Sequence, residues 1–228
     1  MDAIGGKKKG KFISLEGIDG SGKSFLANEI ARHGSNAGNV NLAVLLKDQY
    51  VALGSTFAQK RLHGLYESTW NYPEIEEVWR YSEKYWLYSI CAWYQLHYEL
   101  EVKPRIDEGV DVLVDGWFYK HASRFSLGNN PVTKSLASTL FQNLPATDYT
   151  LFLEIEPEVA AARIGDRIKS TEQGVFNRTS DSDELEGFEA YQQRVSRRLP
   201  TQISDRSTLL TIARPVDPQA IITTISLL

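Results

Sequence analysis

The sequence offers little from which to build disulfides, membrane-spanning helices or a secretory signal. Its single cysteine, Cys91, excludes an intramolecular disulfide, which fits a reducing compartment, and we expect a cytoplasmic protein. No apolar run reaches the roughly eighteen residues that a membrane-spanning helix needs, so we expect no membrane association. The charged start of the chain is not typical of a secretory signal. We expect residues 1–10 to form a flexible tail, with an anion-binding arm as the alternative.

Basic residues and potential metal-binding clusters are scarce too. The chain has 25 Lys and Arg against 29 Asp and Glu, a net charge of −4, whereas proteins that bind duplex nucleic acid usually carry a basic surplus. We therefore expect no nucleic-acid partner. The four histidines are scattered along the sequence, and we see no His/Cys cluster that predicts a zinc site.

Apolar segments of strand length alternate with helical patterns along the whole chain. The segments cover residues 12–16, 42–47, 110–115, 149–155 and 208–212. Because they are continuously apolar, they are typical of strands buried on both faces. They predict an α/β fold with one domain over residues 1–228, in which helices cover both faces of a parallel sheet.

Helical patterns fill the intervals between these strands. We expect helices over about 23–34, 55–67, 73–101, 132–143, 157–169 and 183–199, and a last one that begins at Asp217. The helix at 73–101 is rich in aromatic residues, and Trp86, Trp93 and Leu100 continue a spacing of seven that starts at Tyr72. This spacing favours one apolar face in the core or at a helix–helix interface. The alternative is a stacking surface for a flat base, formed by Trp93, Tyr94 or a neighbour.

A phosphate-binding loop follows the first predicted strand. It contains Gly17, Ile18, Asp19, Gly20, Ser21, Gly22, Lys23 and Ser24, which match the pattern G-x-x-x-x-G-K-[ST]. The glycines let backbone N–H groups turn toward phosphates, and Lys23 adds positive charge. Ser24 offers a hydroxyl to Mg²⁺. A glycine-rich turn without a ligand is the alternative, but the strand before the loop and the helix after it favour phosphate binding.

Two carboxylates are candidates for work beside the phosphates. Asp115 ends the third apolar segment, and a parallel strand delivers its last residue to the edge where ligands bind. Asp115 could hold Mg²⁺ there, or it could be a helix cap. Asp19 lies inside the loop, so it sits close to phosphate or metal, although it could simply form a turn.

A basic segment over residues 163–180 is a candidate lid. Arg163 and Arg167 share one face of the predicted helix, and Lys169 and Arg178 follow. Arginines on a closing lid can neutralise charge on a transferring phosphoryl group, and closure excludes water. The alternative is a solvated helix end, where cations favour the helix dipole.

These residues resemble the thymidylate kinase family. The segment FISLEGIDGSGKS is similar to the family's opening, in which a strand runs into E-G-x-D-G-x-G-K-[ST]. Weaker similarities follow in the right order over most of the chain: VKP with Gly109, LEIEPEVA at 153–160, Arg163 with Ile164 and Arg167, and Tyr191 with Arg194.

The resemblance implies a three-layer P-loop kinase fold with a five-stranded parallel sheet and a lid. It implies that ATP and Mg²⁺ bind, that Asp19 approaches the sugar of the acceptor, and that Asp115 serves the metal and the acceptor. It also implies a homodimer, for which the long aromatic helix would be a natural interface. The catalytic residues would be Lys23, Asp115, Arg163 and Arg167.

The acceptor side departs from the family's pattern. Lys47 stands where the family has arginine after the second strand, Trp93 and Tyr94 where it has an Asp-Arg pair, and Gly116 where it has arginine before an aromatic residue, here Trp117. The candidate acceptor-binding residues are Asp19, Lys47, Trp93, Tyr94 and Trp117. Replacement cations could come from Arg80, Lys84, Lys120 and Arg124.

The sequence therefore predicts an ATP-dependent phosphotransferase that acts on a small molecule. The leading hypothesis is a nucleoside monophosphate kinase that phosphorylates dTMP or a related deoxynucleotide. A kinase of a nucleoside, a modified nucleotide or another small alcohol is the first alternative. A non-catalytic nucleotide-binding regulator is the second; an N-K-x-D motif, which a GTPase would have, is absent.

Overall fold

The computed structural model describes residues 8–34, 41–47, 55–72, 77–174, 187–212 and 216–228. Five strands in these ranges form one parallel sheet with the order β2-β3-β1-β4-β5. The strands are β1 (Phe12–Glu16), β2 (Leu42–Leu45), β3 (Asp111–Val114), β4 (Tyr149–Leu153) and β5 (Thr208–Ile212). All five predicted strands are confirmed. The inner strands β1, β3 and β4 are mostly buried, as expected, whereas the edge strands β2 and β5 are only partly buried.

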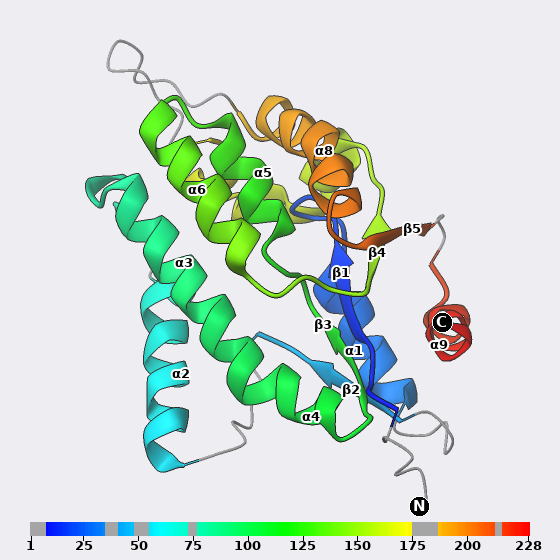
Figure 1. The fold of residues 1–228 in the computed structure, drawn as a ribbon. Coiled ribbons are helices and arrows are strands. Elements are labelled where there is room, and N and C mark those ends of the chain that lie inside the picture. Colours follow the sequence, from blue (N-terminus) through cyan, green and yellow to red (C-terminus); the bar gives the residue numbers. More distant parts are fainter. Residues whose placement is uncertain (1–7, 35–40, 48–54, 73–76, 175–186, 213–215) are drawn as a thin grey trace, which may run out of the picture.

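Helices cover both faces of the sheet and make three layers (Figure 1). On one face, α1 (Lys23–Gly34) and α9 (Pro218–Leu227) pack on Ile13 and Leu15 of β1. On the other face, the helices pack on Phe12 and its neighbours; these helices are α2 (Thr56–Thr69), α3 (Glu83–His97), α5 (Tyr119–Leu127), α6 (Pro131–Asn143) and α8 (Phe188–Ser204). The two sets of β1 residues alternate, as the side chains of a strand must.

The aromatic helix begins later and ends later than the sequence predicts. Ser82 accepts a hydrogen bond from the N–H of Tyr85 and caps α3, so the helix starts at Glu83 and not at residue 73. It also passes Pro104, where the sequence predicts an end. A π turn at Tyr98–Val102 connects α3 to α4 (Lys103–Asp107), and the N–H of Lys103 bonds the carbonyl of Tyr98.

Two other helices differ from the prediction near the candidate site. Helix α7 (Pro157–Ile164) ends at Gly165, whose φ of 59° suits glycine, and short 3-10 turns continue at Gly165–Arg167 and Ser170–Glu172. Helix α5 was not predicted. It has no side-chain cap, and two cations on its inner side, Lys120 and Arg124, obscure its apolar pattern.

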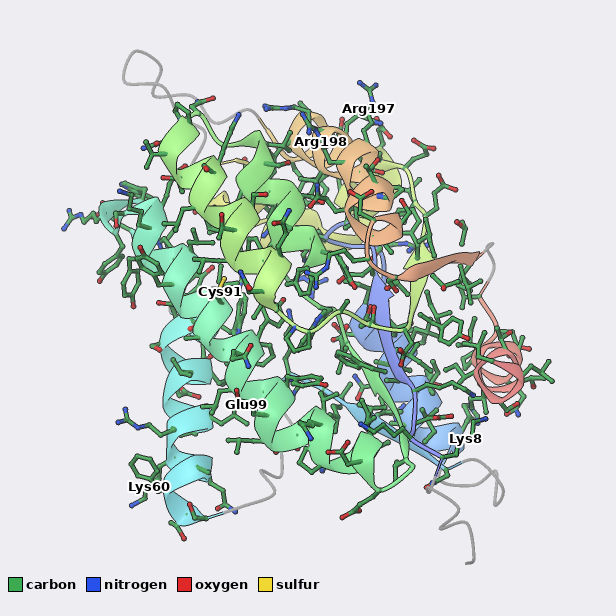
Figure 2. All side chains as sticks on the ribbon, viewed as in Figure 1. Lys8, Lys60, Cys91, Glu99, Arg197 and Arg198 are labelled. Carbon is green, nitrogen blue, oxygen red and sulfur yellow. The ribbon has the colours of Figure 1, made fainter. Side chains whose placement is uncertain are left out.

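Several charged side chains away from the candidate site extend away from the packed faces. Lys60 on α2 and Arg197 and Arg198 on α8 are exposed and extend outward (Figure 2). Across the ranges that the structure describes, no helix combines the length and apolar character needed to cross a membrane.

Candidate functional site

The phosphate-binding loop connects β1 to α1 at the carboxyl edge of the sheet. Gly17, Gly20 and Gly22 have φ values of 155°, 74° and 88°, a region that side chains disfavour. A Cβ on Gly20 would lie 2.7 Å from the carbonyl oxygen of Ala160, so the loop packs closely on α7. At Gly22 the nearest atom to such a Cβ is Nη1 of Arg163, 4.0 Å away. The loop is therefore closely packed against α7 at Gly20 and has free space beside Gly22.

Lys23 lies across this loop at the start of α1. Its Nζ donates to the carbonyl oxygens of Gly17 and Ile18, at 2.9 and 2.8 Å, and to Oγ of Ser21 at 3.1 Å. Burial, with repulsion from Lys120, lowers the pKa of Lys23 to about 8. Ser24 follows in the exposed first turn of α1. Together with the helix N-terminus, Lys23 makes the loop suited to phosphate.

Asp19 is the centre of an ion-pair cluster that joins the loop to α5 and α8. Its Oδ1 accepts from Nζ of Lys120 at 2.6 Å, and its Oδ2 accepts from Arg124 and from Nε2 of Gln192, the latter at 3.0 Å. The N–H of Asp19 also donates to Oε1 of Gln192 at 3.3 Å. Burial opposes the charge of Asp19, but Arg124 and Lys120 outweigh it and hold its pKa well below the usual range.

Asp115 and Lys47 follow β3 and β2 and lie near the same edge. The backbone N–H of Asp115 bonds the carbonyl of Leu45, the last residue of β2. Nζ of Lys47 lies 4.8 Å from the ring centroid of Trp70 and 3.9 Å from a Cβ placed on Gly116. Burial, with repulsion from Lys120, lowers the pKa of Lys47 to about 8.

Glu16 is a buried carboxylate that the sequence analysis did not single out. It ends β1 directly before the loop, and its Oε1 accepts from the N–H of Trp117 at 2.7 Å. Its Oε2 has no hydrogen-bond partner among the described residues. Burial raises the pKa of Glu16 to about 7. The sequence could have indicated Glu16 as a site residue, because it ends a predicted buried strand in the same way as Asp115.

The donor set fits Mg²⁺ only together with phosphates. In the described ranges, no group of three or more His, Cys, Asp or Glu could hold a metal ion. Mg²⁺ commonly takes one or two protein oxygens and completes its shell with water and substrate phosphates. Ser24 and Asp115 are compatible with such a site.

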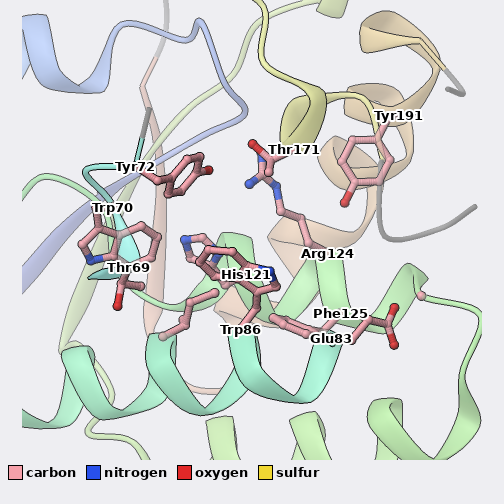
Figure 3. Close-up of a pocket in the computed structure, with 12 residues that line it drawn as sticks. Thr69, Trp70, Tyr72, Glu83, Trp86, His121, Arg124, Phe125, Thr171 and Tyr191 are labelled. Carbon is pink, nitrogen blue, oxygen red and sulfur yellow. The ribbon is translucent and has the colours of Figure 1, made fainter. Parts of the chain in front are cut away.

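A pocket that is partly open to solvent lies beside the ion-pair cluster, and Figure 3 shows the residues that line it. Arg124 belongs to both. Aromatic side chains dominate the lining, and polar groups come from α2, α3, α5, α8 and the 3-10 turn at Ser170–Glu172. The lining residues are Thr69, Trp70, Tyr72, Glu83, Trp86, Ile90, His121, Arg124, Phe125, Gly128, Thr171 and Tyr191.

The three aromatic residues expected at the acceptor do not line this pocket. Trp93, Tyr94 and Trp117 are almost fully buried in the core. The hydroxyl of Tyr94 donates to the carbonyl of Trp117 at 2.9 Å, and Nε1 of Trp117 donates to the carbonyl of Pro145 at 2.8 Å. Trp70 packs edge-on against Trp93 and lines the pocket, where the sequence predicts Trp93. The core interpretation of the aromatic helix therefore describes Trp93 and Tyr94 better than the stacking one.

His121 is a pocket residue that sequence reasoning missed. It is buried, and its ring centroid lies 5.1 Å from that of Trp70. Burial, helped by Arg124, holds its pKa well below the usual value, so the imidazole is neutral. A neutral imidazole can donate one hydrogen bond and accept another. The spacing of the histidines gave no signal for this role.

The two predicted lid arginines lie at the end of α7 but do not form one face. Arg163 is exposed and near Gly22. Beyond Gly165 the chain leaves the α-helix, and Arg167 turns back to the carbonyls of Ile164 and Arg163, both at 3.3 Å. Arg178 lies outside the described residues. The 3-10 turn at Ser170–Glu172 contacts α8, because Nε2 of Gln192 donates to the carbonyl of Glu172 at 3.0 Å.

Comparison with known proteins finds several thymidylate kinases that are similar to this chain. No protein-family model matches the chain. A probable thymidylate kinase 2 from Saccharolobus solfataricus is 26% identical over 215 residues, which are 90% of this chain and 88% of that protein. A thymidylate kinase from Dinoroseobacter shibae is 28% identical, with 90% and 84% covered. One from Francisella tularensis subsp. novicida is 27% identical, with 74% and 78% covered.

Proposed function

Because this chain is a relative of the thymidylate kinases, we propose that it is an ATP-dependent nucleoside monophosphate kinase. The proposed reaction transfers the γ-phosphoryl group of ATP to dTMP or a related deoxynucleotide and yields ADP and the diphosphate. The observation that carries the proposal is Asp19, which belongs to the phosphate-binding loop and pairs with Arg124 of the neighbouring pocket. One side chain thus joins a donor site to an acceptor site.

The residues of the chain would act mainly by position and charge. The loop and Lys23 would bind the β- and γ-phosphates of ATP, and Ser24 and Asp115 would hold Mg²⁺. When bound, Mg²⁺ supplies positive charge to the phosphates. Arg163 lies on the open side of the loop, near Gly22, and would balance charge that develops on the transferred group. Arg167 would do so after movement of the lid.

The acceptor pocket would bind the base of the nucleotide. Trp70 and Tyr72 offer aromatic faces, and His121 offers a neutral hydrogen-bonding group. A nucleoside or another small alcohol is the second candidate acceptor, because Gly116 provides no side chain to bind an acceptor phosphate.

An acceptor panel separates these candidates. ADP release would be measured with ATP, Mg²⁺ and dTMP, dUMP, dCMP, dGMP or dAMP, their ribose forms, or the free nucleosides. We expect turnover with a deoxynucleoside monophosphate and none with the matching nucleoside. Turnover with nucleosides alone would support the second candidate. ATP binding without turnover on the whole panel would contradict the proposed kinase activity on nucleotides.

ATP binding should weaken as the pH rises through about 8. The pKa of Lys23 is about 8 in the folded protein, so its ammonium loses charge above that pH. Bound phosphate stabilises the charged form, so the Kd for a non-hydrolysable ATP analogue should rise by up to about tenfold per pH unit. Lys23→Arg is the control, because arginine keeps its charge throughout this range. Calorimetric titrations from pH 7 to 10 would contradict this if the unmodified protein and the variant gave parallel, flat profiles.

The expected homodimer stays a prediction. The chain has a mass of 25.7 kDa, so a dimer should sediment as a species of about twice that mass. Sedimentation equilibrium over a tenfold range of concentration measures this directly, and a single monomeric species at the highest concentration would contradict it.

A further inference from the structure

We propose that Lys120 and Arg124 bind the phosphate of the acceptor, and that Asp19 positions these two cations instead of contacting the acceptor's sugar. This inference rests on the proposed function and names the residues that hold the acceptor. Lys120 and Arg124 lie one turn apart on α5, so both reach the same side of the helix. Their side chains are only 13% and 16% exposed, and both pair with Asp19.

Lys120 and Arg124 share one hydrogen-bonded carboxylate, that of Asp19. Other charges of both signs lie nearby: Lys47 repels Lys120, whereas Glu172 attracts both cations and Glu16 attracts Lys120. A dianionic phosphate would add a second hydrogen-bonded anion to the pair, whereas an uncharged sugar would not.

Arg124 has a donor left over for such an anion. Its terminal nitrogen bonds Asp19, but its buried Nε has no hydrogen-bond partner among the described residues. Arg124 also lines the pocket, together with Thr171 and Tyr191 (Figure 3). Guanidinium groups bind phosphate oxygens through two parallel N–H bonds, so an acceptor phosphate would use the free donor.

Asp19 has little capacity left for the sugar. Its Oδ1 accepts from Lys120, and its Oδ2 accepts from both Arg124 and Gln192. Its side chain is 12% exposed. These contacts resemble those of a carboxylate that orients cations, and they make a direct hydrogen bond to a hydroxyl of the acceptor less favourable.

The competing explanation is that the two cations only brace the phosphate-binding loop. Binding experiments distinguish the two explanations. Cations that only stabilise the loop would affect the binding of ATP, whereas cations that bind the acceptor's phosphate would affect the binding of the acceptor. Isothermal titration calorimetry would compare dTMP with thymidine, and dCMP and dGMP with their nucleosides, without ATP. The ratio of the two Kd values in each pair measures the phosphate's contribution and needs no turnover, so it stands or falls separately from the kinase activity.

We expect the unmodified protein to bind the best monophosphate at least about tenfold more tightly than its nucleoside, as one charge-assisted contact predicts. Arg124→Gln and Lys120→Met should each lose most of this ratio, while binding of an ATP analogue changes less than about threefold. Arg124→Lys should recover part of it, because charge returns without the planar fork. The exposed Arg197→Gln and Lys60→Met are matched controls and should keep the full ratio.

Asp19→Asn tests the positioning role. We expect weaker binding of the monophosphate and unchanged binding of the nucleoside, because only the cations lose their anchor. Equal losses for monophosphate and nucleoside would place Asp19 at the sugar and overturn that part of the proposal. Two results would overturn the phosphate-binding role of Lys120 and Arg124. One is that their variants keep the ratio of Kd values but bind the ATP analogue poorly; the other is that the unmodified protein shows no preference for the monophosphate.

Discussion

Lys23→Ala is expected to abolish phosphoryl transfer, with kcat lowered by about 10³ or more, as the loss of a charge stabilising the transition state predicts. The ammonium of Lys23 lies over the loop and bonds the carbonyls of Gly17 and Ile18. Because the hydrogen bonds of Lys23 reach only residues of its own loop, the fold should survive the change. Kinetics with ATP and the best acceptor measure the loss, and thermal unfolding checks the fold.

The exposed Lys60→Ala is the control for this variant and should keep full activity. A folded Lys23→Ala protein with kcat within about threefold of the unmodified protein would contradict the assignment of the loop, since such a difference is below 1 kcal/mol.

Trp93→Ala should destabilise the protein by about 3–5 kcal/mol, the usual range for a buried tryptophan. The side chain is 1% exposed, stacks on His97 with the ring centroids 4.7 Å apart, and packs edge-on against Trp70 at 5.5 Å. Urea unfolding measures the change. Trp93→Phe keeps a ring at the site and should leave the KM of the acceptor nearly unchanged.

Trp79→Ala is the matched control, because Trp79 is 45% exposed. It should change the free energy of unfolding by about 1 kcal/mol or less, as most exposed positions do. The stacking interpretation of Trp93 would return if Trp93→Ala were nearly as stable as the unmodified protein but bound the acceptor poorly.

The sheet and the phosphate-binding loop could be predicted from the sequence because both depend on local patterns. A short, mainly apolar run such as Phe12–Glu16 is typical of a buried strand, and the fixed spacing from Gly17 to Ser24 needs no distant residue. The start of α3 was missed although Ser82, a good N-cap, stood in the sequence. The predicted start at residue 73 follows the run of aromatic residues and ignores this N-cap.

The proposed acceptor side could not be predicted, because it is assembled from residues far apart in the sequence. Asp19 and Gln192 are separated by 173 positions and Asp19 and Arg124 by 105. Arg124 was one of four candidate cations, and only tertiary packing distinguishes it from Arg80, which pairs with Glu77 at the surface. Trp93 and Trp70 are both tryptophans, and the residues that flank them in the sequence do not show that Trp70, and not Trp93, lines the pocket.

Transfer of label from γ-³²P-ATP is the most direct test of the proposed activity. The protein would be incubated with labelled ATP, Mg²⁺ and each nucleoside monophosphate, and the products would be separated. We predict that label appears in the nucleoside diphosphate in proportion to the ADP formed. Release of the label as inorganic phosphate, with the monophosphate unchanged, would contradict the account.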